Sequence, residues 1–279
     1  MIIWIASYPK SGNTWIRLFL NSLIYSDNSS IDINDIKIRL FPIRKDFESL
    51  SENINDVNEL IRNCLYSQIR LNLDKSVKIF KSHNALWQSQ NYKFTNEENT
   101  LATVYIVRDP RNIITSIKNH YIFENYDTSL KFMTDDKQTI GIKKNAKLEI
   151  DLPTIISSWK NHYNSWKKLK RKYLLIKYEN LLNKPLEEFT KITKFLENIS
   201  DFRFEEKKIL RSIENCNFKN LKTQEYSKGF KEAPVNNLGK PIKFFNLGPD
   251  NNWEKLLDPK TVDKLENIFG DEMKELGYL

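Results

Sequence analysis

The chain has 279 residues, of which 40% are hydrophobic and 29% are charged, and its formal net charge is +8. This composition is typical of a soluble globular protein long enough to bury a large core, and the chain lacks the apolar run of ~18–20 residues that crosses a bilayer. The short apolar start has no basic flank and the only cysteines are Cys64 and Cys216, so we expect no signal peptide and no disulfide framework, but buried thiols in a cytoplasmic setting.

The apolar pattern predicts strands that alternate with helices along the chain. In the first half, the predicted elements are a strand over 2–7, a helix from Thr14, a helix over 57–71, strands over 77–80 and 103–107, and a helix from Pro110. In the second half, they are a helix from Pro153 to Trp166, a strand over 173–177, and helices over 185–196, 204–216 and 259–269. Asp109 is the expected N-cap of the helix that begins at Pro110.

Two segments show no clear period. Residues 134–145 are polar and are expected to be mobile, whereas residues 217–252, which contain three glycines, are expected to form a lid or a binding loop. The alternation elsewhere implies an α/β fold, with a parallel central sheet flanked by helices in a single domain over 1–279. Ligands of such sheets lie beyond the carboxyl ends of the strands, so the polar residues after each strand are the candidates for a site.

The first strand runs into the segment Ser7-Tyr8-Pro9-Lys10-Ser11-Gly12-Asn13-Thr14-Trp15. A tight turn there exposes backbone N–H groups, the following helix adds the positive end of its dipole, and Lys10 supplies a full charge. The segment therefore predicts a phosphate cradle. It differs from the ATP-binding loop G-x-x-x-x-G-K-[ST], because here the lysine precedes the glycine and Pro9 fixes the backbone.

Two other strand ends carry chemistry. Arg108 follows the third strand and Ser116 lies eight residues later, and a guanidinium and a hydroxyl two turns into a helix can bind the same phosphate oxygens. Lys81-Ser82-His83 follows the second strand. A histidine ordinarily has a pKa of about 6.5, which suits a general base. The other histidines, His120 and His162, lie in predicted helices and are expected to be structural or at the surface.

These motifs resemble those of the sulfotransferase family, whose first loop reads Y-P-K-S-G-[TN]-T-W and whose second strand ends in K-[TS]-H. The resemblance implies that the 5′-phosphosulfate of 3′-phosphoadenosine-5′-phosphosulfate (PAPS) is held by the loop residues Lys10, Ser11, Gly12, Asn13 and Thr14. It implies adenine contacts from Trp15, Tyr178 and Phe218, and 3′-phosphate contacts from Arg108 and Ser116. His83 is then the catalytic base, and Lys10 and Lys81 stabilise charge during transfer.

The family's closing motif, R-K-G-x-x-G-x-W, is only partly kept. Gly248 and the tryptophan five residues later match it, but Asn246-Leu247 stands in place of Arg-Lys and Asn251 in place of the second glycine. In the family this motif closes over the 3′-phosphate. Two alternatives follow: either the lid grips the nucleotide less tightly, or the missing cations are replaced by a nearby lysine, Lys240 or Lys243.

The resemblance implies a P-loop-nucleotide-kinase-like sulfotransferase fold and in-line transfer of a sulfuryl group from PAPS to an acceptor hydroxyl or amine, without a metal. The product is 3′-phosphoadenosine-5′-phosphate (PAP). We expect a small-molecule, lipid or carbohydrate acceptor and a monomer or homodimer. The net charge suits anionic partners or a solvated basic surface equally, and no arginine-rich helix supports a nucleic-acid partner. An ATP- and Mg²⁺-dependent kinase and a catalytically silent nucleotide- or glycan-binding module remain the alternatives.

Overall fold

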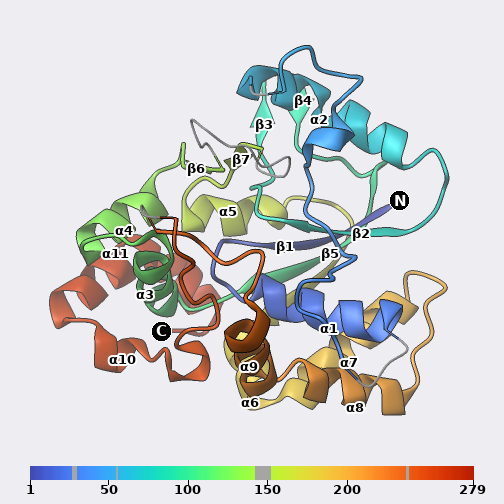
Figure 1. Ribbon diagram of the computed structural model, residues 1–279. Helices are drawn as coiled ribbons and strands as arrows, with labels where there is room; N and C mark the ends of the chain where they lie inside the picture. The colour runs from blue at the N-terminus through green and yellow to red at the C-terminus, as the bar shows by residue number, and fades with distance from the viewer. Residues whose placement is uncertain (27–29, 55, 142–151, 237–238) are drawn as a thin grey trace. The chain divides into compact units, whose positions relative to one another are not determined.

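The structure is a computed structural model of the chain, and it describes all residues except 27–29, 55, 142–151 and 237–238 (Figure 1). The described residues form two compact units. The first contains Met1–Tyr8, Arg39–Ile106 and Thr134–Leu175, and the second contains Pro9–Ile38, Val107–Met133 and Ile176–Leu279. Each unit is therefore assembled from separate stretches of the chain, and the single domain expected from the sequence stays a prediction.

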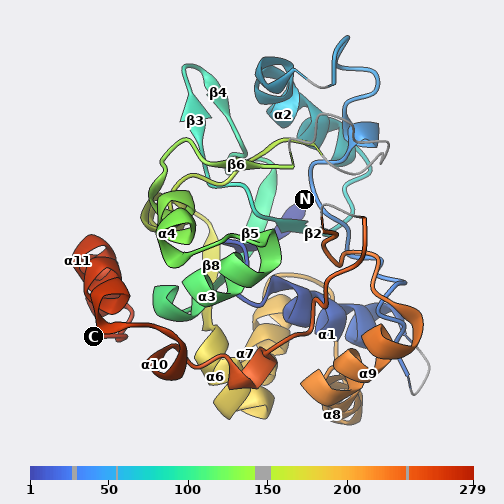
Figure 2. The same cartoon turned by 60° about the vertical axis from the view of Figure 1, so that its left-hand side comes forward.

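The first unit is built on a four-stranded sheet with the strand order β2-β1-β5-β8 (Figure 1, Figure 2). The strands are β1 (Ile2–Ser7), β2 (Lys78–Ser82), β5 (Thr100–Val107) and β8 (Lys172–Lys177). The central strand β1 is parallel to both β2 and β5, and all 6 of its residues are buried. A strand buried on both faces needs no polar alternation, which explains the unbroken apolar run at the start of the sequence.

Helices and two-residue strands complete the first unit. They are η1 (Arg44–Asp46), α2 (Val57–Leu71), β3 (Gln88–Ser89), β4 (Tyr92–Lys93), β6 (Thr139–Ile140), β7 (Thr154–Ile155) and α5 (Trp159–Trp166). The core is aromatic, since the ring centroid of Trp4 lies 5.4 Å from that of Phe41 and 5.2 Å from that of Phe94. The indole nitrogen of Trp4 donates to the Thr100 hydroxyl at 3.0 Å, so its polar group is satisfied inside this core.

The described elements of the second unit are helical. They are α1 (Asn13–Tyr25), α3 (Pro110–Tyr121), α4 (Tyr126–Thr134), α6 (Tyr178–Asn183), α7 (Pro185–Glu197), α8 (Glu206–Asn215), α9 (Phe218–Lys228), η2 (Gly248–Asp250), α10 (Trp253–Leu256) and α11 (Pro259–Glu275). Phe19 stacks on Phe189 at 4.1 Å between ring centroids and joins α1 to α7. The Ser22 hydroxyl donates to Ser212 at 3.1 Å and joins α1 to α8. Packing of α1 on these helices fixes the start of α1, where the predicted phosphate loop ends.

The structure confirms several features that were predicted from local sequence signals. Helix α2 has the predicted bounds, and the side chain of Asp109 caps α3 by accepting from the N–H of Arg111, with Pro110 as the first helical residue. Cys64 and Cys216 are both buried and free, as expected, and burial raises the pKa of each thiol.

Other expectations about local structure are wrong. No helix begins at Pro153: the short strand β7 follows it, and α5 begins only at Trp159, after the Ser158 side chain accepts from the N–H of Asn161. Part of the segment expected to be an aperiodic loop is helix α9. Leu221 is the buried residue of α9, so the sequence shows no apolar stripe there. The expected mobility of residues 134–145 stays a prediction: residues 139–140 form β6, and residues 142–145 lie outside the described residues.

Candidate functional site

The loop after β1 depends on a glycine. Gly12 precedes α1 with a φ of 101°, and a Cβ atom there would lie 2.5 Å from Cδ2 of Tyr178. Both the backbone conformation and the close ring therefore exclude other residues. Helix α1 has no side-chain cap, and the positive end of such a helix suits an anion.

Lys10 contacts a histidine that the sequence did not select for the site. Its ammonium nitrogen lies 3.3 Å from Nδ1 of His120 and 4.3 Å from the ring centroid of Phe244. His120 lies in the last turn of α3, which starts two residues after the predicted phosphate ligand Arg108. The only sequence feature that could have indicated this contact is the position of His120 on the helix after Arg108. The contact with Lys10 depends on how α3 packs, which the sequence does not display.

Arg108 and Ser116 lie together as the sequence predicted. Nη1 of Arg108 donates to the Ser116 hydroxyl oxygen at 3.2 Å and to the backbone carbonyl of Lys10 at 3.0 Å. The guanidinium carbon lies 4.2 Å from the ring centroid of Tyr178. One arginine thus joins the first loop, the start of α3 and the residue after β8 into a single cluster in the second unit.

Two of the three predicted adenine-contacting aromatics form a pair, and the third packs on a glycine. Trp15 packs edge-on against Tyr178, with 6.1 Å between ring centroids. Phe218, the first residue of α9, packs against Gly248, where a Cβ atom would lie 2.2 Å from its ring. The close approach of Phe218 therefore requires a glycine at position 248, independently of any ligand.

Some buried polar atoms around this cluster lack a hydrogen-bond partner among the described residues. Ser11 Oγ, Trp15 Nε1 and Arg108 Nε are buried and have no hydrogen-bond partner among the described residues. Buried polar groups are normally paired, and each unpaired one costs roughly 1–3 kcal/mol. These atoms fit a bound polar ligand, such as an anionic nucleotide, that would satisfy them.

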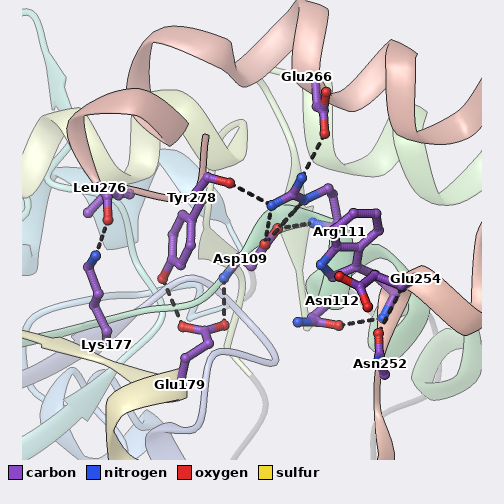
Figure 3. Close-up of polar contacts among 11 residues, drawn as sticks. Asp109, Arg111, Asn112, Lys177, Glu179, Asn252, Glu254, Glu266, Leu276 and Tyr278 are labelled. Carbon is purple, nitrogen blue, oxygen red and sulfur yellow. Dashed lines mark hydrogen bonds and ion pairs between the residues drawn. The ribbon is translucent and has the colours of Figure 1, made fainter.

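A polar network holds the turn that carries Arg108, and Figure 3 shows it. The N–H of Asp109 donates to Glu179 at 3.0 Å, and the hydroxyl of Tyr278 donates to the other carboxylate oxygen of Glu179 at 2.9 Å. Burial raises the pKa of Glu179, and these two hydrogen bonds oppose that rise by stabilising its charged form. Arg111 pairs with Asp109 and with Glu266, each at 2.7 Å. The network thereby fixes the end of β5 beside Tyr178, the residue that precedes Glu179.

His83 and Lys81 belong to the first unit, whereas the other predicted site residues belong to the second. Nδ1 of His83 lies 2.8 Å from the carbonyl oxygen of Ser7. A carbonyl oxygen only accepts, so Nδ1 carries a proton, and in the neutral form of the ring the lone pair is then on Nε2. Lys81 is in β2, where its N–H donates to the Arg39 carbonyl at 3.0 Å. The tautomer of His83 is the one that a general base acting through Nε2 requires.

His162 has a structural role, as expected. It is fully buried, and burial lowers its pKa to about 3. Its Nε2 lies 3.2 Å from the His83 carbonyl and its Nδ1 lies 2.8 Å from the Tyr105 hydroxyl. The neutral ring therefore donates once and accepts once, which satisfies both nitrogens in the core.

Among the described residues, no group of three or more His, Cys, Asp or Glu side chains could hold a metal ion. None of the helices described is both long and apolar enough to cross a bilayer.

Several known proteins are similar to this chain over nearly its whole length. Flavonol 3-sulfotransferase of Flaveria bidentis is 21% identical over 99% of this chain and 83% of its own length. Flavonol 4′-sulfotransferase of Flaveria chlorifolia is 23% identical over 99% of this chain and 80% of its own. The solved structure of mouse sulfotransferase SULT7A1 complexed with PAP has a TM-score of 0.60 and 17% identity, and covers 97% of this chain and 83% of its own.

A structure of retinol dehydratase in complex with androsterone and inactive cofactor PAP has a TM-score of 0.59 and 16% identity, with coverage of 98% of this chain and 80% of its own. These structural likenesses confirm the predicted α/β sulfotransferase fold. The family model for the sulfotransferase domain matches residues 2–277. Since that match spans nearly the whole sequence, the chain belongs to the sulfotransferase family.

Proposed function

We propose that this sulfotransferase moves a sulfuryl group from PAPS to a hydroxyl or amine of a small-molecule acceptor and releases PAP. The observation that carries the proposal is the contact of Arg108 with both Ser116 and the carbonyl of Lys10. It joins a site suited to a 3′-phosphate to the loop suited to the 5′-phosphosulfate. An ATP-dependent kinase has no use for the first of these sites.

Each predicted site residue has its own role in binding PAPS or in the transfer step. The N–H groups at the start of α1, with Ser11 and Lys10, would hold the 5′-phosphosulfate and oppose its negative charge. Nε2 of His83 would take the proton from the acceptor as its oxygen or nitrogen attacks sulfur. Lys81 would stabilise the charge that develops on the leaving phosphate as the S–O bond breaks. Trp15, Tyr178 and Phe218 would contact the adenine.

The remaining parts of the proposal rest on the relatives. Two of them are named as flavonol sulfotransferases, and others in Arabidopsis thaliana are named as cytosolic sulfotransferases. Flavonols are therefore the first acceptors to test, followed by lipid and carbohydrate alcohols. We propose a cytoplasmic monomer or homodimer that needs neither a metal nor a nucleic acid.

The deciding experiment is transfer of labelled sulfate from PAPS to a panel of flavonols, sterols, sugars and amines, with EDTA present. Labelled product with at least one acceptor is expected. In parallel, PAP should raise the melting temperature with a dependence on its concentration, and ATP with Mg²⁺ should not. Equal stabilisation by ATP and Mg²⁺ would favour the kinase. Stabilisation by PAP without transfer to any acceptor would favour the silent binding module.

A further inference from the structure

Asn251 lies where the family motif has a glycine, and both the oxygen and the nitrogen of its side-chain amide form hydrogen bonds. It is 7% exposed. Its amide oxygen accepts from the Thr115 hydroxyl at 2.7 Å. Its amide nitrogen donates to the Asn112 carbonyl at 2.9 Å and to the Ser116 hydroxyl oxygen at 3.0 Å. The Asn112 carbonyl can only accept, so the nitrogen of the amide, and not its oxygen, must face this part of α3.

This orientation determines what Ser116 can do. The hydroxyl oxygen of Ser116 accepts from Asn251 at 3.0 Å and from Nη1 of Arg108 at 3.2 Å. A hydroxyl has one proton and two lone pairs, so these two donors occupy both lone pairs. The proton of Ser116 must then point away from both, and the structure shows no acceptor for it among the described residues. Ser116 is thereby left as a hydrogen-bond donor.

A second unused donor lies in the same cluster. Nε of Arg108 is buried and has no hydrogen-bond partner among the described residues. Two donors without acceptors, one of them on a permanent cation, suit an anion. The cluster of Arg108, Ser116 and Asn251 therefore fits a phosphate.

The segment that carries Asn251 is held against α3 by a second contact. The N–H of Trp253 donates to the side-chain oxygen of Asn112 at 3.0 Å, and the guanidinium of Arg111 lies 4.0 Å from a ring centroid of Trp253. In contrast, the two lysines considered from the sequence, Lys240 and Lys243, are both exposed. The residue of the closing segment that contacts the predicted 3′-phosphate ligands is thus a neutral amide.

We propose that Asn251 is a positioning residue for the 3′-phosphate of the nucleotide, and that it acts through Ser116. By occupying a lone pair of the hydroxyl, it holds Ser116 as a donor toward the phosphate. It thereby gives this chain a preference for 3′-phosphorylated nucleotides although Asn246-Leu247 supplies no cation. The inference rests on the proposed function, because it assumes that PAP or PAPS binds at this cluster.

The test is calorimetric titration of PAP and of adenosine 5′-monophosphate, compared as the ratio of their dissociation constants. Asn251→Ala should lower the preference for PAP by roughly two- to tenfold, the range expected for one hydrogen bond, and should leave binding of the monophosphate unchanged. In a Ser116→Ala background, Asn251→Ala should have no further effect on the ratio, because its route to the phosphate is already lost. Asn251→Asp should lower the preference more than Asn251→Ala, since a carboxylate can only accept and would take the Ser116 proton that the phosphate needs.

The matched control is Asn252→Ala, which changes the same residue type one position later. The Asn252 side chain accepts from the N–H of Glu254 and caps α10, so this variant should keep the wild-type ratio. Asn251→Gly, with the residue that the family has at this position, should behave as Asn251→Ala and serves if the alanine variant does not fold. An equal loss of both nucleotides, an unchanged ratio, or an undiminished effect of Asn251→Ala in the Ser116→Ala background would overturn the inference. A wild-type protein without preference for PAP would instead overturn the proposed function.

Discussion

The ammonium nitrogen of Lys10 lies 3.3 Å from Nδ1 of His120. Lys10 carries three donors and no acceptor, so His120 must accept through Nδ1 and carry its own proton on Nε2. The ring of Phe244 lies on the same ammonium group, at 4.3 Å from its centroid. The lysine that we assign to the sulfuryl group is therefore already oriented by two neighbours, and its orientation depends on a neutral histidine.

His120→Phe should lower kcat/KM of sulfuryl transfer by about two- to tenfold, because a phenyl ring cannot accept the hydrogen bond from Lys10. His120→Gln, whose side-chain oxygen can accept, should stay within about twofold of the wild type. The measurement is steady-state transfer from labelled PAPS. Asn119→Phe is the control, since Asn119 is the exposed preceding residue of the same helix. Equal effects of His120→Phe and Asn119→Phe would show that the contact with Lys10 has no functional role.

Local sequence signals predicted much of the fold and the proximity of Arg108 to Ser116. Asp109 and Pro110 marked the start of α3, and the order of residues in the loop after β1 distinguished it from an ATP-binding loop. These features act within a few residues of the chain, so a sequence displays them. The contact of His120 with Lys10 joins residues 110 positions apart, and the role of Asn251 depends on hydrogen bonds to a helix some 135 positions away. Neither has a local signature.

Helix α9 escaped prediction for a different reason. Most of its residues are polar, and Leu221 is the one that is buried, so packing leaves no periodic trace in the sequence. Its cap does leave one: the Asn217 side chain accepts from the N–H of Asn220. Asparagine before an otherwise polar segment is a weak signal, because asparagine is equally common in turns.

Arg108→Ala should weaken binding of PAP by at least about tenfold and should change the affinity for adenosine 5′-monophosphate much less. A hydrogen bond to a charged group contributes roughly 1.5–3 kcal/mol, and Arg108 would make that contact only with the 3′-phosphate. Arg108→Lys keeps the charge but loses the forked donor, so it should restore only part of the preference. Titration of both nucleotides with all three proteins checks this. Because Arg108 also bonds the Lys10 carbonyl, an equal loss for both nucleotides would assign it a purely structural role.

Buried His162 should make the protein less stable in mild acid. Burial lowers its pKa in the folded state to about 3, whereas the unfolded chain has a histidine pKa of about 6.5. Below that value the unfolded state binds a proton that the folded state does not, so the stabilisation is complete above pH ~6.5 and is lost as the pH falls toward ~3. The loss approaches ~1.4 kcal/mol per pH unit.

His162→Gln removes this titration. The free energy of unfolding in urea, measured at several pH values between 7.5 and 5.5, should be higher for the wild type at the upper end. The difference between the two proteins should then shrink by about 1 kcal/mol per pH unit below pH ~6.5. A difference that is constant across this range would mean that His162 does not titrate between the two states.

His83→Asn should abolish most turnover and leave nucleotide affinity nearly unchanged. The asparagine amide can still donate to the Ser7 carbonyl, which Nδ1 of His83 contacts at 2.8 Å, but it has no basic nitrogen at the position of Nε2. Because the base acts on the acceptor proton in the transition state, its loss should lower kcat by roughly 10²–10⁴-fold. Single-turnover transfer, measured beside titration of PAP, separates the two effects.

Lys10→Ala is the comparison, because Lys10 would contact donor oxygens both before and during transfer. This variant should lose affinity and rate together, whereas His83→Asn should lose rate alone. With an alcohol acceptor, the wild-type rate should also fall in acid as His83 gains a proton. If His83→Asn keeps most of its turnover, the base is another group. His162 is fully buried and engaged at both nitrogens, so His120 beside Lys10 would be the histidine to replace next.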